Sequence, residues 1–273
     1  MLYYYAYTGH KIGLDRVKKA AAIIKGLESH GVECRLLVND FRAGLAAREY
    51  GVADSITIET IQDIDAVAQI GNSVIIDSPE DDHGRLEKYC NEFNAVFVWR
   101  QNAEDKVRFS EYLLDGVAVD KAYEEAANKE KVSRKLFFLS DADYDKVILN
   151  HASLFENKRL ELLLGHYFFV KYEDDLAKIF NILHEPEEYM DLIQSSKTII
   201  TSSLQTAFEA KMSGACVYFL NLLKADEAQI HYLQRNGIEM VQTIDEIDFK
   251  QNCIDTSFNQ LESIVEDILQ KLN

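Results

Sequence analysis

The chain has 273 residues, of which 47% are hydrophobic, with only 2 Pro and 12 Gly. This composition excludes a disordered protein and leaves room for a large core or for two domains. With 46 acidic against 29 basic residues, the formal charge of −17 opposes attraction to nucleic acid or to an anionic membrane. No apolar run approaches the roughly 18 residues of a membrane span, and no signal-like leader is visible at the start. We therefore expect a cytoplasmic protein without nucleic-acid partners or membrane insertion.

The first half of the chain alternates short apolar runs with helical segments. Residues 14–27 place apolar side chains at helical spacing on one face, which predicts the first long helix. The apolar runs are of the kind found in buried parallel strands. Strands are expected at residues 2–8, 34–38, 55–58, 73–77, 95–99 and 117–119.

A polar stretch at residues 121–133 separates this series from a second one. The second series predicts strands at residues 135–139, 160–164, 167–170, 198–201, 216–220 and 239–241. Alternating strands and helices are typical of parallel α/β sheets. We therefore predict two α/β domains, residues 1–122 and 133–273.

A last helix is marked by Ser257 and Gln260, which have the spacing of a capping box. Its broad apolar face must pack on something. Packing across the domain junction and packing on its own domain fit the pattern equally well.

Ser202 and Ser203 lie between a buried-type strand and a helix that contains Glu209. Unpaired N–H groups and the helix dipole favour a phosphate at such a helix start, and the two hydroxyls add further hydrogen-bonding groups. Glu209, about two turns further on, could bind the hydroxyls of an attached sugar. The alternative is that Ser202 or Ser203 only caps the helix.

The loop after the first strand contains Gly9, His10 and Arg16. Gly9 permits a tight turn and close approach of a ligand, at the sheet edge where doubly wound proteins bind ligands. His10 could act as a general base at neutral pH, or could have only a structural or surface role. Arg16 could neutralise a phosphate or lie along a helix face.

Four cysteines are scattered along the chain, Cys34, Cys90, Cys216 and Cys253. Their spacing indicates neither a disulfide framework nor a zinc site, so we expect structural roles for them. Asp141 and Asp143 are more typical of a turn than of a cation-binding site. We therefore expect no metal and no cofactor.

Four segments together resemble a known group of proteins. They are Tyr5-Ala-Tyr-Thr-Gly-His10, Val74-Ile-Ile-Asp77, Lys197-Thr-Ile-Ile-Thr-Ser-Ser203 with Phe208-Glu-Ala210, and Tyr232-Leu-Gln-Arg-Asn-Gly237. They look like the UDP-sugar hydrolase of pseudaminic acid synthesis and, more distantly, the N-acetylglucosaminyltransferase of peptidoglycan lipid intermediates. The likeness covers nearly the whole chain in order and length. It implies the GT-B architecture, two Rossmann-like domains facing a cleft, with the nucleotide held mainly by the second domain.

The resemblance also implies roles for individual residues. His10 matches the family's Gly-His, which supplies a base near the anomeric centre of the sugar. Ser202 and Ser203 match its diphosphate-binding turn, and Glu209 matches the acid that contacts the nucleotide sugar or the ribose. Asp77 matches the aspartate that ends an Ile-Ile-Asp strand, although a strand-end carboxylate or a cap is an equal alternative for it.

The chain departs from the family at three places. Leu139-Ser-Asp-Ala-Asp143 replaces a glycine-rich turn, which restricts the approach of a diphosphate and adds two repelling carboxylates. The Gly-His loop is three residues longer before its arginine. Trp99-Arg-Gln-Asn102 replaces an expected acidic turn. These changes favour an altered ligand or a loss of catalysis.

Three hypotheses about function follow. The first is an enzyme that hydrolyses a nucleotide sugar, most consistent with a UDP-sugar, or transfers the sugar to an acceptor. The second is a catalytically silent GT-B-like protein that binds a ligand or a protein partner. The third is a module that binds a metabolite or nucleotide tightly without a partner.

Overall fold

The computed structural model describes residues 1–250, 253, 258 and 260–272. The chain divides into two compact units. Unit 1 comprises Met1–Gly9, Arg16–Asp120 and Asn259–Asn273, and unit 2 comprises His10–Asp15 and Lys121–Phe258. This division differs from the predicted domain ranges at three places. Residues 10–15 and residues 121–122 group with unit 2, and the C-terminal segment groups with unit 1.

Unit 1 contains a six-stranded, all-parallel sheet in the order β3-β2-β1-β4-β5-β6. Its strands are β1 Leu2–Ala6, β2 Cys34–Val38, β3 Ser55–Thr57, β4 Ser73–Asp77, β5 Ala95–Trp99 and β6 Tyr112–Leu114. Its helices are α1 Asp15–Ser29, whose first residue groups with unit 2, α2 Phe41–Glu49, α3 Ile64–Val67, α4 Arg85–Glu92 and α11 Leu261–Leu272, with a 3-10 turn at Ile61–Asp63.

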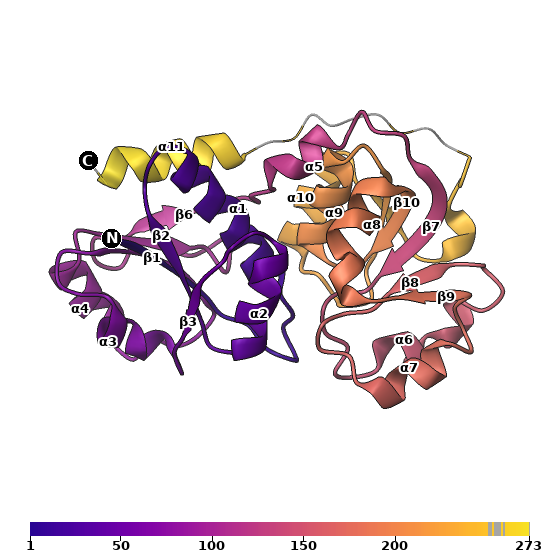
Figure 1. The fold of residues 1–273 in the computed structure, drawn as a ribbon, viewed down its shortest axis with the longest axis horizontal. Coiled ribbons are helices and arrows are strands. Elements are labelled where there is room, and N and C mark those ends of the chain that lie inside the picture. Colours follow the sequence, from indigo (N-terminus) through magenta and orange to yellow (C-terminus); the bar gives the residue numbers. More distant parts are fainter. Residues whose placement is uncertain (251–252, 254–257, 259, 273) are drawn as a thin grey trace. The chain divides into compact units, whose positions relative to one another are not determined.

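Helices cover both faces of this sheet, which explains why its inner strands are mostly apolar and buried. α3 and α4 pack on one face, through a core that includes Ile64, Leu86 and Tyr89 (Figure 1). On the other face, α11 packs near α1: a Cβ atom added to Gly26 would lie 2.7 Å from Val265. The C-terminal helix therefore belongs to the core of unit 1, while Ser257 of its predicted capping box lies outside the described residues.

Unit 2 repeats the topology with six parallel strands in the order β12-β11-β10-β7-β8-β9. Its strands are β7 Val132–Phe138, β8 Glu161–Leu163, β9 Ile182–His184, β10 Ser196–Thr201, β11 Cys216–Leu220 and β12 Glu239–Val241. Its helices are α5 Lys121–Glu125, α6 Val147–Asn150, α7 Val170–Leu176, α8 Tyr189–Ser195, α9 Leu204–Met212 and α10 Glu227–Arg235, with 3-10 turns at Ala152–Leu154, Pro186–Glu188 and Ile244–Glu246.

Both sheets have the strand order of the Rossmann fold, with the reversal between β1 and β4 in unit 1 and between β7 and β10 in unit 2. The predicted α/β fold with two Rossmann-like domains is confirmed. Two predicted strands are wrong. The sixth strand of unit 1 is β6, Tyr112–Leu114, not residues 117–119, and residues 167–170 lead into α7 while β9 supplies the missing strand.

Both errors have the same physical origin. Residues 117–119 and 167–170 are short apolar runs, and a short apolar run that is buried by packing has the same sequence pattern as a strand. Val117 and Tyr167 are indeed buried, but outside any strand. β9 begins at Ile182, which is 47% exposed, and such an edge strand carries a weak apolar signal.

Candidate functional site

The predicted site residues lie at the strand-order reversals of the two sheets. In unit 1, Asp77 ends β4, and Gly9 follows β1. In unit 2, Ser202 and Ser203 follow β10, next to the turn that follows β7. Open α/β sheets bind ligands outside the carboxyl ends of their strands at these reversals. Each unit therefore has polar residues at the edge where its topology favours a ligand.

Ser202 and Ser203 are buried, 6% and 3% exposed, and their hydroxyls have partners within unit 2. Ser203 caps α9: its Oγ accepts a hydrogen bond from the Thr206 N–H at 3.0 Å. The Ser202 hydroxyl donates to the Leu220 carbonyl oxygen at the end of β11. The helix begins where the sequence predicts it. Ser203 caps this helix, as the alternative interpretation of the two serines proposed.

A carboxylate already lies at the start of α9. Ser203 Oγ is 2.9 and 2.8 Å from the two carboxylate oxygens of Asp15, which also belongs to unit 2. A negative group is favoured there by the helix dipole. A phosphate that contacts the Ser203 hydroxyl therefore has to replace the Asp15 carboxylate.

Glu209 lies in α9, as predicted, and is only 2% exposed. Its Oε2 accepts a hydrogen bond from the Tyr189 hydroxyl at 2.5 Å, and its Oε1 accepts one from Gln205 Nε2 at 2.9 Å. The Tyr189 oxygen also lies 2.7 Å from Thr206 Oγ1. This network links Glu209 to the first turn of α9 and holds its carboxylate in one orientation.

The loop after β1 is hydrogen-bonded at its start and then lies close to the residues that follow β7. Thr8 donates its N–H to Asn39 Oδ1 at 2.7 Å, which fixes the chain before Gly9. Beyond Gly9, the His10 ring lies 5.2 Å from the Tyr144 ring, centroid to centroid, and the His10 side chain is exposed. Gly13 has a φ of 83°, which favours glycine, and a Cβ atom there would lie 3.7 Å from Asp141 Cβ.

Asp77 is 1% exposed and is surrounded by donors of unit 1. Arg16 Nε lies 3.2 Å from its Oδ1, and Lys19 Nζ lies 2.8 Å from its Oδ2. Tyr4 and Gln101 contribute weaker hydrogen bonds at 3.3 and 3.4 Å. Burial, followed by the Asp77 charge, raises the pKa of Tyr4, so Tyr4 remains a neutral donor. The structure thus brings the predicted residues Arg16 and Asp77 together.

The sequence reasoning missed a histidine paired with a buried carboxylate. His166 Nδ1 lies 3.0 Å from Oδ1 of Asp141, whose side chain is 1% exposed. Both follow strands of unit 2, β7 and β8. Gly165 makes the pairing possible, because a Cβ atom there would lie 2.5 Å from the Asp141 carbonyl carbon. The sequence did contain a signal for this histidine. Gly165-His166 follows an apolar strand, which is the pattern that marked Gly9-His10.

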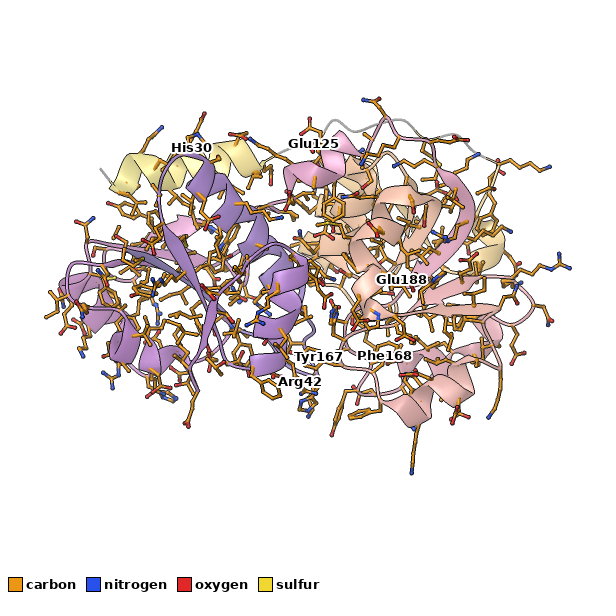
Figure 2. The ribbon with its side chains drawn as sticks, viewed as in Figure 1. His30, Arg42, Glu125, Tyr167, Phe168 and Glu188 are labelled. Carbon is orange, nitrogen blue, oxygen red and sulfur yellow. A yellow bond between two sulfur atoms is a disulfide. The ribbon has the colours of Figure 1, made fainter. Side chains whose placement is uncertain are left out.

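Asp143 acts as a turn and cap residue, as the turn interpretation predicted. Its Oδ1 accepts a hydrogen bond from the Val147 N–H at 2.6 Å, its Oδ2 accepts one from the Ile148 N–H at 3.2 Å, and Tyr172 donates its hydroxyl to Oδ2. Burial and the Asp143 carboxylate raise the pKa of Tyr172. The segment from β8 to α7 contains Tyr167 and Phe168 (Figure 2). It contacts this turn, because the Tyr167 N–H donates to the Asp141 carbonyl at 2.9 Å.

The structure corrects the expectation about disulfides. Cys216, at the start of β11, is bonded to Cys253, 37 residues later. The pairing depends on the fold bringing two distant residues together, so spacing alone did not reveal it.

Within the described ranges, no group of three or more His, Cys, Asp or Glu side chains is arranged to hold a metal ion. No helix of the described chain is long and apolar enough to span a bilayer.

Comparison with known proteins gives the fold a name. No protein-family model and no curated protein matches the chain. Among solved structures, the UDP-GlcNAc 2-epimerase from Methanocaldococcus jannaschii, in complex with UDP-GlcNAc and UDP, is similar with a TM-score of 0.59 and 12% identity, over 99% of this chain and 100% of that one. The S. aureus MnaA-UDP structure has a TM-score of 0.57 and 12% identity, over 99% and 87%.

The UDP-GlcNAc 2-epimerase from Neisseria meningitidis, bound to UDP-GlcNAc, has a TM-score of 0.53 and 11% identity, over 100% of this chain and 99% of that one. At these identities the likeness establishes the fold. The chain has the fold of the GT-B-type nucleotide-sugar proteins, as its short motifs had implied.

Proposed function

We propose that the protein is an enzyme that acts on a nucleotide sugar, with a UDP-sugar as the preferred class. The observation that carries this proposal is the similarity over nearly the whole chain to structures solved with UDP-GlcNAc or UDP. The position of the polar residues at the strand-order reversals of both sheets adds to it.

Unit 2 is proposed to hold the nucleotide. Ser202, Ser203 and the first turn of α9 face the diphosphate, and Glu209 binds the ribose or the sugar. Glu209 is suited to this role because Tyr189 and Gln205 hold its carboxylate in one orientation, so little freedom is lost on binding. Binding through Ser203 includes displacement of Asp15 from the helix start.

His10 is proposed as the base for hydrolysis. Water attacks the anomeric carbon, the bond from that carbon to the diphosphate oxygen breaks with its electron pair leaving on UDP, and His10 accepts the proton of the water. Gly9 and Arg16 are proposed substrate contacts in the first half of the chain, and Asp77 is proposed to act on the substrate through Arg16. In transfer, an acceptor hydroxyl takes the place of water, with the same bonds and the same proton path.

A thermal-shift series with UDP, CDP and GDP and their sugars tests the proposal. A ligand that binds only the folded state raises its melting temperature by mass action, so UDP and a UDP-sugar are expected to raise it and the other nucleotides to have less effect. Chromatography of the products then separates hydrolysis, transfer and epimerisation. The absence of any response at millimolar ligand would contradict the proposal.

Two substitutions separate binding from catalysis. His10→Gln is expected to lower turnover by about a hundredfold while leaving UDP affinity unchanged, the usual scale for a lost general base. Glu209→Gln is expected mainly to weaken UDP-sugar binding, and it retains a side chain that can hydrogen-bond to Tyr189. The matched control is His30→Gln, at the residue that directly follows α1. Unchanged turnover in the His10 variant would exclude His10 as the base.

The second candidate function is a catalytically silent GT-B-like protein. Two observations favour it: Asp15 lies at the start of α9, and Leu139-Ser-Asp-Ala-Asp143 lacks the two glycines that the resemblance implies for the phosphate turn. Such a protein would bind a ligand or a protein partner without turning a substrate over. UDP binding without any product from a broad panel of UDP-sugars would support it.

A further inference from the structure

The side chain of Arg16 is held in place by two neighbours of unit 1. Its Nε–H donates to Asp77 Oδ1 at 3.2 Å, and one Nη2–H donates to Gln101 Oε1 at 2.7 Å. Gln101 is itself fixed, because its Nε2 donates to the Trp99 carbonyl at 3.0 Å and its N–H donates to Asp105. A guanidinium that is oriented in advance loses little conformational freedom when it binds a further group.

The remaining donors of Arg16 face no acceptor within the part of unit 1 that the structure describes. Among the described residues, Arg16 donates only through Nε and Nη2, so both N–H groups of Nη1 are left for another partner. The side chain is 23% exposed, enough for a ligand to reach it.

Two cations meet at Asp77. Asp77 contacts Arg16 and Lys19, whose side chains are only 23% and 16% exposed. Lys19 is held over the Trp99 ring at 3.8 Å from its centroid. A group that binds Arg16 therefore lies close to a second, partly buried cation.

The cluster lies at the ligand edge of its sheet. Asp77 is the last residue of β4 and Trp99 is the last residue of β5, beside the reversal between β1 and β4. A purely structural ion pair between α1 and β4 would need only one cation and no oriented amide. The available donors of Arg16 and the position of the cluster agree on a binding role.

We propose that Arg16, oriented by Asp77 and Gln101, binds an oxyanion group of the ligand, a carboxylate or a phosphoryl group on the sugar or on the acceptor. This inference rests on the proposed function only in assigning the nucleotide itself to unit 2. Arg16 is the binding residue, and Asp77 and Gln101 are positioning residues. The planar guanidinium can donate two parallel hydrogen bonds to a carboxylate or to a phosphoryl group, and the ammonium of Lys cannot reproduce this geometry.

Calorimetric titration of the full chain tests this proposal with three probes: inorganic phosphate for the phosphoryl source, glucuronate for the carboxylate source, and glucose as the neutral analogue of glucuronate. At least one of the two anions is expected to bind, and glucose to bind at least tenfold more weakly, since a charged hydrogen bond is lost. Preference for phosphate or for glucuronate identifies the source. Equal binding of all three, or of none, overturns the proposal.

Three variants locate the binding. Arg16→Gln is expected to lower anion affinity at least tenfold, and Arg16→Lys to restore only part of it. Arg35→Gln, which removes an exposed arginine from β2, is the matched control and leaves affinity unchanged. Unchanged affinity in Arg16→Gln overturns the proposal.

A fourth variant decides the outcome if Arg16→Gln does not fold. Gln101→Met removes one hydrogen bond to Arg16 without removing a charge, so a loss of about threefold in anion affinity is expected, and unchanged affinity overturns the proposal. UDP-induced thermal stabilisation is measured on the same variants. If it persists while anion binding is absent from wild type, the anion site is wrong and the nucleotide proposal stands.

Discussion

At the scale of single residues, the Asp82 carboxylate is held by donors from both near and distant parts of the sequence. Asp82, 7% exposed, accepts a hydrogen bond from Arg108, 26 residues away, and another from the Gly84 N–H at 2.8 Å. Burial raises the pKa of Asp82, but the Arg108 guanidinium and the N–H groups of Gly84 and Leu86 outweigh it. The net pKa lies below its usual value.

This lowered pKa predicts a pH-dependent stability. Because the folded state favours the charged carboxylate, Asp82 stabilises the fold above the unfolded pKa of about 4, and this contribution is lost as the pH falls through the lower folded pKa. Asp82→Asn is expected to lower the free energy of unfolding by at most about 1 kcal/mol at pH 7, since Arg108 is 56% exposed and solvent screens the pair.

Urea unfolding at pH 7 and at pH 2.5 measures this difference. The loss in Asp82→Asn is expected to shrink at the lower pH, whereas Asp81→Asn, a change at an exposed neighbour, has little effect at either pH. A loss that is the same at both pH values would show that the Asp82 charge is not the cause.

At the scale of secondary-structure elements, the turns that follow β7 and β8 fit together only because one residue has no side chain. Gly165 lies so close to Asp141 that a Cβ atom would be 2.5 to 2.6 Å from its backbone atoms. The contact is with backbone, which cannot move aside as a flexible side chain can. The Asp141–His166 pair depends on this close approach.

Gly165→Ala is therefore expected to lower the free energy of unfolding by about 2–3 kcal/mol, the upper range for overpacking in a dense region. Gly31→Ala is the control: it has a φ of 78° but open space around it, and a cost of about 1 kcal/mol is expected from backbone strain alone. Chemical denaturation measures both. Equal losses in the two variants would contradict the close approach at Gly165.

At the scale of the whole molecule, unit 1 is completed by a segment distant in sequence. α11 buries Leu261, Ile264, Val265 and Ile268 in unit 1, although most of the residues between it and the rest of that unit belong to unit 2. Damage to α11 should therefore destabilise unit 1 first.

Ile268→Ala is expected to lower the stability of unit 1 by about 2–4 kcal/mol, the usual cost of truncating a buried aliphatic side chain. Hydrogen exchange followed by mass spectrometry should show faster exchange in peptides from α1 and β5, with smaller changes in peptides from α9 and β10. Glu266→Ala, on an exposed position of the same helix, is the control. Equal acceleration in both units would contradict the assignment of α11 to unit 1.

The sequence by itself determined the α/β class, the two series of strands, and the helix start at Ser203. These features depend on local periodicity and capping, which neighbouring residues encode. The motifs around Gly9 and Ser203 also pointed to the GT-B-type fold, which the comparisons bear out.

Only the tertiary structure decided which distant residues meet. The Cys216–Cys253 disulfide, the Asp141–His166 pair, the donors around Asp77 and the grouping of α11 with unit 1 all join residues far apart in the chain. No local pattern encodes such contacts, because they arise from the order of strands in the sheets and from the turns at the strand ends. For the same reason, the sequence could place Ser203 at a helix start, but could not show that Asp15 lies against it.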